Sequence, residues 1–120
     1  MNERSIFHLT AQEHQAATDF VQRLHERFPG EILDVTLFGS KARGDSGPWS
    51  DVDILVTVTE ESWPRRAEIS MLAADVSLAY DVLLAPRVIG RERWERMKQN
   101  QFSLYRNIVA EGISLAPVLS

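Results

Sequence analysis

Two aspartates at the start of an apolar segment constrain the fold of this chain more than any other feature. Asp51 and Asp53 stand two positions apart, immediately before the apolar run 54–58. Because side chains alternate along a strand, the two carboxylates would share one face of it. Carboxylates held side by side repel each other, and a bound divalent cation removes that cost. The spacing therefore predicts a strand that carries a site for a hard metal ion with oxygen ligands.

A glycine–serine turn precedes this pair. The apolar run 32–38 predicts a buried strand, and Gly39 and Ser40 follow it directly. Gly39 has no Cβ, so a phosphate can approach the backbone closely, and Ser40 is expected to cap a short helical turn. Exposed N–H groups at such a turn bind anions, and Lys41 and Arg43 add positive charge. The turn is not a P-loop, since no Gly-Lys-Ser/Thr ends it, but it predicts a phosphate cradle beside the metal pair.

These motifs, taken in order, resemble those of a known enzyme superfamily. Gly39-Ser40, Ala42-Arg43-Gly44 and Ser50-Asp51-Val52-Asp53 look like the signature of the nucleotidyltransferases related to DNA polymerase beta. The short chain most resembles the minimal nucleotidyltransferases, often antitoxins encoded beside HEPN-domain ribonucleases, and residues 111–113 look like that family's ending. The resemblance implies an α+β fold with a palm-like core, in which helices pack on a small mixed sheet, as a single domain over residues 1–120.

The resemblance also implies a role for individual residues. Asp51 and Asp53 would hold two Mg²⁺ ions, and Asp81, on a third strand, would complete the set of metal-binding and catalytic carboxylates. Asp75 competes for that third place but falls in a predicted helix. The phosphates of ATP would be bound by the residues of the turn, namely Gly39, Ser40, Lys41 and Arg43.

Three functions follow from the resemblance. The first is transfer of AMP from ATP to a hydroxyl of a partner protein, with the chain acting as antitoxin on a HEPN-type ribonuclease toxin. The second is an antitoxin that neutralises its toxin by binding alone. The third is a nucleotidyltransferase that acts on a small molecule as a dimer. The acceptor, the base preference and the choice between a homo- and a hetero-oligomer stay open at this point.

Periodicity and capping signals predict the other elements. Thr10 and Glu13 form a capping box for a first helix, which the pair Pro29-Gly30 ends. A strand is expected from about residue 53 to 59, and Ser62 is the expected N-cap of a helix. The remaining elements are a helix over 63–78 with Ala67, Met71, Ala74 and Leu78 on one stripe, a strand over 80–85 stopped by Pro86, a basic helix over 91–100 and a short helix over 103–111 with Gly112 as C-cap.

Composition and charge limit the class of protein. The chain has 120 residues, a net charge of −4 and no cysteine, so we expect one cytoplasmic domain without disulfides, membrane span or general affinity for nucleic acid. Residues 87–106 nevertheless carry a local charge of +4, either a solvated helix face or a docking surface for an acidic partner or for the phosphates of the nucleotide. The aromatic and imidazole side chains are expected to be structural or on the surface: Trp49, Trp63 and Trp94 as packing residues, His8, His14 and His25 as surface residues.

Overall fold

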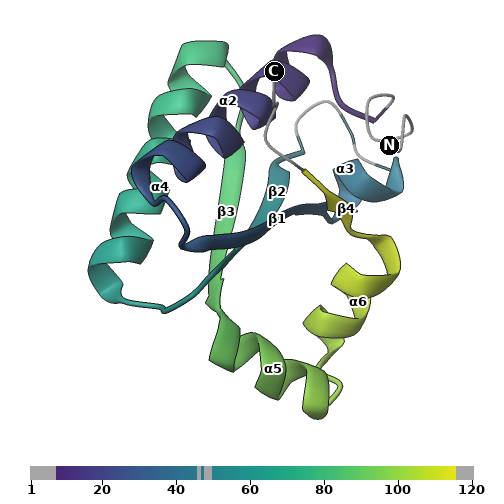
Figure 1. The fold of residues 1–120 in the computed structure, drawn as a ribbon. Coiled ribbons are helices and arrows are strands. Elements are labelled where there is room, and N and C mark those ends of the chain that lie inside the picture. Colours follow the sequence, from purple (N-terminus) through teal and green to yellow (C-terminus); the bar gives the residue numbers. More distant parts are fainter. Residues whose placement is uncertain (1–7, 46, 48–49, 116–120) are drawn as a thin grey trace.

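The computed structural model describes residues 8–45, 47 and 50–115. Over this range the chain folds into helices and strands that alternate along the sequence, except that two helices follow each other near its C-terminal end (Figure 1). In chain order they are α2 (Ala11–Arg27), β1 (Ile32–Phe38), α3 (Ser40–Arg43), β2 (Val52–Val58), α4 (Trp63–Tyr80), β3 (Leu84–Gly90), α5 (Arg91–Gln99), α6 (Ser103–Glu111) and β4 (Ile113–Ser114).

The strands form one four-stranded mixed sheet in the order β3-β2-β1-β4. Strand β1 is antiparallel to both of its neighbours, and β2 is parallel to β3. The parallel pair requires a crossover, which α4 supplies. This arrangement confirms the predicted α+β class with a small mixed sheet.

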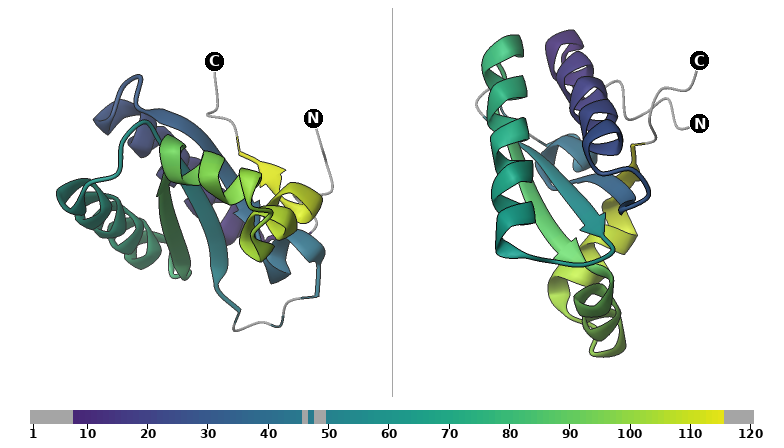
Figure 2. Two further views of the ribbon diagram at one scale, coloured as in Figure 1. Left: turned by 90° about the horizontal axis from the view of Figure 1, so that it is seen from below. Right: turned by 60° about the vertical axis from the view of Figure 1, so that its left-hand side comes forward.

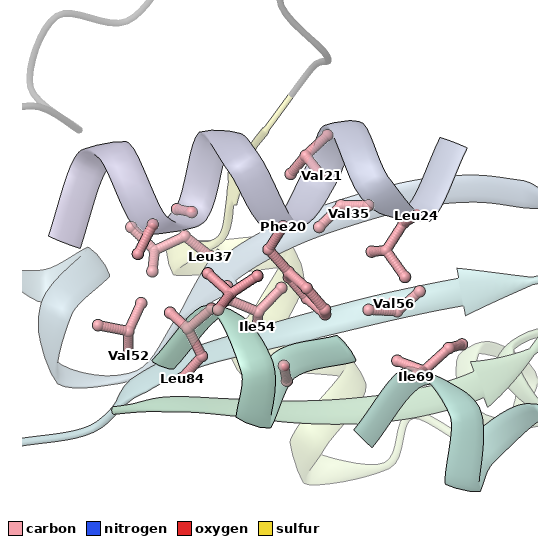
Figure 3. Packing of buried hydrophobic residues seen from close by; sticks show 14 of the residues in the cluster. Phe20, Val21, Leu24, Val35, Leu37, Val52, Ile54, Val56, Ile69 and Leu84 are labelled. Atoms are coloured by element: carbon pink, nitrogen blue, oxygen red, sulfur yellow. The ribbon is translucent and has the colours of Figure 1, made fainter. Parts of the chain in front are cut away.

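Helices α2 and α4 run side by side over one face of the sheet (Figure 2). Phe20 and Leu24 of α2 and Ile69 of α4 are fully buried against Ile54 and Val56 of β2 (Figure 3). Because side chains alternate along β2, Leu55 points to the opposite face, where a smaller cluster packs beneath α5 and α6. The sheet is therefore covered by two helices on one side and only in part on the other.

The capping box of the first helix is confirmed. The Thr10 hydroxyl accepts a hydrogen bond from the Glu13 N–H at 3.1 Å, and the Glu13 carboxylate accepts one from the Thr10 N–H at 2.9 Å. Ser62 likewise caps α4 through the Arg65 N–H, as predicted. Capping residues thus set the start of both long helices.

The apolar stripe predicted along α4 lies on the outer side of the helix. The buried residues of α4 are Ile69, Ala73 and Val76, whereas Met71 and Leu78 are exposed. Trp63 is exposed as well, so its predicted packing role is wrong. A stripe at helical spacing ordinarily faces the core, but α4 carries a second apolar face that does so instead.

The third strand begins and ends later than predicted. Helix α4 continues to Tyr80, Asp81 adopts the left-handed conformation that ends it, and β3 starts only at Leu84. Pro86 lies inside β3 rather than after it. A proline is tolerated there because β3 is an edge strand with β2 as its single neighbour.

The C-terminal elements agree closely with the prediction. Helix α6 has the predicted bounds, and Gly112 is its C-cap with ordinary extended backbone angles. The need for glycine at this place is steric, because a Cβ on Gly112 would overlap with the Ile108 carbonyl oxygen and the Thr36 methyl group. Across the described ranges, no helix combines the length and apolar character needed to cross a membrane.

Candidate active site

The two aspartates lie at the N-terminal end of β2. Asp53 pairs with Phe38 of β1 across the antiparallel ladder and is half-buried, whereas Asp51 precedes the strand and is exposed. Burial raises the pKa of the Asp53 carboxyl above its ordinary range, the negative charge of Asp51 raises it further, and Arg87 and Arg43 offset part of this. The structure therefore brings the predicted pair together on the face of the sheet opposite α2 and α4.

Gly39 leaves the space that the Asp53 carboxylate occupies. Its φ of +77° is in the region that favours glycine. A Cβ built on Gly39 would overlap with Oδ2 of Asp53 and would lie 3.3 Å from Cγ of the same residue. Glycine is thus needed at position 39 to leave room for the Asp53 carboxylate, a reason that the sequence alone did not reveal.

The predicted short helical turn is present, but Ser40 is not its cap. Gly39 occupies the N-cap position of α3 and no side chain caps the helix there. The Gly39 carbonyl accepts hydrogen bonds from the N–H groups of Ala42 and Arg43. Ser40 is the first helical residue and is half-buried beside the carboxylate strand.

Lys41 is buried, and its ammonium group has an internal partner. The residue is 4% exposed, and its Nζ lies 2.9 Å from Oε2 of Glu13, which is itself buried. Glu13 belongs to the capping box of α2, so the pair ties the turn to the first helix. Among the predicted phosphate-binding residues, Lys41 is therefore a structural support rather than a solvated cation.

Arg43 connects the turn to the C-terminal helix. Its guanidinium donates to Asp45 at 3.0 Å and to Glu111 of α6 at 3.1 Å. These two carboxylates raise the pKa of Arg43, and the hydrogen bond that its guanidinium donates to Asp45 contributes most. Glu111, which the sequence analysis assigned to the C-terminal signature of the family, thus fixes Arg43, a residue of the predicted phosphate-binding turn.

Arg87 is a basic residue that the sequence analysis placed in the basic segment and did not assign to the site. It pairs with Leu55 in the parallel ladder, and alternation along β3 puts it on the face that carries Asp53. It is exposed and takes part in no ion pair or side-chain hydrogen bond among the described residues. The signal was present in the sequence, but ending the strand at Pro86 assigned Arg87 to the basic segment instead of to the sheet.

The predicted third carboxylate does not join the pair in the structure. Asp81 is the exposed C-cap of α4, and residues 8–45, 47 and 50–115 contain no group of three or more acidic or histidine side chains placed to hold a metal ion. The N–H of Val52 donates to the carbonyl of Leu83 at 2.8 Å, so β2 and β3 begin at the same end of the sheet, with Asp51 just before β2 and Asp81 a few residues before β3. The role of Asp81 stays a prediction from the resemblance.

The other side chains named from the sequence lie apart from the pair or outside the described residues. Trp49 is outside them. Trp94 packs against Tyr105 with ring centroids 5.0 Å apart, in agreement with its predicted packing role. His14 is exposed and His25 half-buried on α2, while His8 is half-buried and its imidazole lies where a Cβ of Gly44 would be.

A mixed sheet with an acidic pair beside a glycine turn is an arrangement suited to chemistry on nucleotide phosphates, and comparison with known proteins identifies the family. The model of the nucleotidyltransferase domain family matches residues 18–113. The chain belongs to this family.

Relatives from Methanocaldococcus jannaschii share part or most of this length. One, named "Putative protein adenylyltransferase MJ0604", is 33% identical over 100 residues, which are 83% of this chain and 94% of that protein. A second of the same designation, MJ0141, is 45% identical over 53 residues, 43% of this chain and 54% of that protein.

Solved structures share the fold at low sequence identity. A chain of a toxin–antitoxin crystal structure with AMP-PNP has a TM-score of 0.55 and 20% identity, over 84% of this chain and 73% of that one. A chain of an MntA–HpeT toxin–antitoxin variant has a TM-score of 0.50, also at 20% identity, over 98% of this chain and 74% of that one. At this identity the likeness concerns the fold.

Proposed function

We propose that the protein transfers AMP from ATP to a hydroxyl group of a partner protein in a Mg²⁺-dependent reaction. The observation that carries the proposal is the acidic pair itself. Asp53 is half-buried beside Asp51, on the open face of the sheet, and Gly39 leaves room for its carboxylate. A stable fold that retains two repelling carboxylates in this place gains from a cation between them.

The donor set fits a hard divalent cation. Asp51 and Asp53 offer carboxylate oxygens, the ligands that Mg²⁺ prefers. When bound, two Mg²⁺ ions would neutralise the triphosphate, favour ionisation of the acceptor hydroxyl and stabilise the leaving pyrophosphate. Asp81, the C-cap of α4 shortly before β3, would contribute to the same set, as the family resemblance implies.

Four residues around the pair would bind the nucleotide phosphates. Gly39 and Ser40 would position the β- and γ-phosphates. Arg43, fixed by Asp45 and Glu111, supplies a charge of restricted direction, whereas Arg87 is available for a phosphate. Lys41 acts indirectly, by anchoring the turn to α2 through Glu13. Such a site works by positioning and electrostatics.

The reaction forms one bond and breaks one. The acceptor oxygen attacks the α-phosphorus, the bond from this phosphorus to the bridging oxygen of the β-phosphate breaks, and pyrophosphate leaves. The hydroxyl proton passes to a carboxylate, a role for which Asp81 is the candidate. No covalent intermediate on the protein is needed, because binding alone brings the two reactants together.

A protein acceptor is favoured over a small molecule. Relatives are named protein adenylyltransferases, and chains of the same fold occur in toxin–antitoxin structures. We propose a HEPN-type ribonuclease toxin as the partner, modified on a hydroxyl such as that of a tyrosine, and a cytoplasmic location. Neutralisation by binding alone and transfer to a small molecule are the rival functions.

Mass spectrometry of the partner tests the proposal. After incubation of a HEPN-type ribonuclease with ATP, Mg²⁺ and the wild-type protein, we expect the ribonuclease to carry added AMP and to lose activity. The double variant Asp51→Asn/Asp53→Asn should give neither result. Equal neutralisation by the double variant would support binding alone, and an unmodified ribonuclease that stays active would overturn the proposed acceptor.

A further inference from the structure

The outer face of α4 is apolar along its whole length. Trp63 is 77% exposed, Met71 66% and Leu78 84%. Ala67 and Ala74 lie between them at helical spacing, and the buried residues of the helix lie on its opposite side. A helix that is apolar on both sides is usually buried on both sides. We call Trp63, Ala67, Met71, Ala74 and Leu78 the outer stripe.

Two charged residues that flank the outer stripe have partners within the chain, whereas Asp75, next to Ala74, is exposed and takes part in no ion pair among the described residues. Arg66 pairs with Glu61, and Glu68 pairs with Arg27 of α2. The charge that remains at the border of the outer stripe is therefore that of Asp75. As Figure 1 shows, α4 lies at the margin of the molecule with its outer side away from the sheet.

The order of side chains along the outer stripe is symmetric about its centre. Trp63 and Leu78 are equally distant from the midpoint between Ser70 and Met71, and so are Ala67 and Ala74. If two copies of α4 pair antiparallel, a large side chain at each end meets a large one, and alanine meets alanine where the helices approach. A surface that complements itself in this way suits a two-fold interface.

We propose that the outer stripe pairs with that of a second copy of this chain, so that the protein forms a two-fold dimer through antiparallel α4 helices. Burying the large side chains of both stripes removes roughly 1,000 Å² from water, which is at the lower limit for a specific interface and indicates a weak dimer. The acidic pair lies on the opposite face of the sheet from α4. Both sites of the dimer therefore stay open to partner and nucleotide.

Sedimentation equilibrium tests the dimer with two matched variants. Between about 5 and 500 µM we expect the wild type to change from monomer to dimer. Ala74→Glu puts a carboxylate in the centre of the interface and should raise the dissociation constant by at least ~10-fold. Ala79→Glu, an exposed position of the same helix off the outer stripe, is the control and should leave association unchanged.

Cysteine pairing tests the direction of the helices, since the chain has no cysteine of its own. In the antiparallel dimer residue 67 of one copy faces residue 74 of the other, while identical positions are roughly 10 Å apart along the axis, too far for a disulfide. A mixture of Ala67→Cys and Ala74→Cys proteins should therefore cross-link under oxidation, and each protein alone should not. A monomer at every concentration, or cross-linking of each variant with itself, would overturn the proposal.

Discussion

The ammonium group of Lys41 and the carboxylate of Glu13 form an ion pair of 2.9 Å, although both residues are buried. The same carboxylate accepts the hydrogen bond from the Thr10 N–H that begins α2. One side chain thus fixes the start of a helix with one oxygen and the turn beside the acidic pair with the other. The position of that turn depends on a residue far from it in sequence.

Separating these two roles gives the first prediction. Glu13→Gln keeps an oxygen for the capping box but loses the charge, so it should leave Lys41 buried without a counter-ion and destabilise the protein by about 3 kcal/mol. Urea unfolding measures this. The control Glu92→Gln removes the exposed pair with Arg96 and should cost less than about 1 kcal/mol. Equal effects of the two substitutions would show that the buried pair contributes no more than an exposed one.

The second prediction concerns the charge at Asp53. Its raised pKa means that the folded protein holds the proton more tightly than the unfolded chain. Without metal, Asp53→Asn should therefore be more stable than the wild type at neutral pH. This difference should disappear as the pH falls below the ordinary value of 3.8, where both states are protonated. Thermal unfolding across pH measures it.

Mg²⁺ should reverse the order of stability, so that the wild type becomes more stable than Asp53→Asn. The metal should raise the melting temperature of the wild type and have little effect on Asp53→Asn, because it stabilises the state that binds it. Transfer of AMP should be lost in the variant. Full activity of Asp53→Asn would contradict the role of the acidic pair.

Gly39 allows backbone strain to be separated from steric overlap. Gly39→Ala should lose transfer activity and destabilise the fold, since a Cβ would displace the Asp53 carboxylate. Gly30→Ala is the matched control: its φ of +74° is similar, but nothing lies within 4 Å of its Cβ, so it should show only the backbone cost of about 1–2 kcal/mol. The excess loss of stability in Gly39→Ala, measured by urea unfolding, reports the contact. An equal loss of stability in Gly39→Ala and Gly30→Ala would mean that the Asp53 carboxylate can move away from the added Cβ without cost.

Arg87 should act on the nucleotide and not on the fold. Arg87→Met keeps the aliphatic stem but removes the charge, and we expect affinity for Mg²⁺ and a non-hydrolysable ATP analogue to fall by about 10- to 100-fold. Titration calorimetry measures this affinity. Arg91→Met, at the exposed start of α5, is the control and should bind normally. Unchanged binding in both variants would remove Arg87 from the site.

Substitutions of Asp81 and Asp75 test which of these two residues is the third carboxylate of the site. Asparagine adopts the left-handed conformation that Asp81 has at the end of α4, so Asp81→Asn should fold normally. We expect it to lose transfer activity while it largely keeps Mg²⁺–nucleotide binding, and Asp75→Asn to have nearly full activity. A radiolabelled-AMP transfer assay distinguishes them. Full activity of Asp81→Asn would limit Asp81 to its role as helix cap.

Local signals in the sequence predicted the elements that local interactions determine. The continuous apolar run predicted the bounds of β1, and capping residues predicted where α2 and α4 begin. The end of β3 could not be predicted in this way, because proline ends a central strand but is tolerated in an edge strand, and the neighbours of a strand depend on the whole sheet.

The sequence predicted that the acidic pair and the glycine turn lie together, but it did not predict the ion pairs that surround them. Asp51, Asp53 and the glycine turn are close in sequence, so spacing alone brought them together. The pairing of Lys41 with Glu13 and of Arg43 with Glu111 joins segments that are distant along the chain. Burial of a lysine is unusual and becomes possible only when such a partner is supplied.

Pro86 in β3 has a consequence for how other chains can associate with the protein. An edge strand with a full row of N–H donors is a template on which a further strand can add, and proline removes one donor from that row. Continuous sheet extension across β3 is thereby interrupted, which protects the protein against aggregation through this edge. Association at this edge of the sheet is thereby left to side chains.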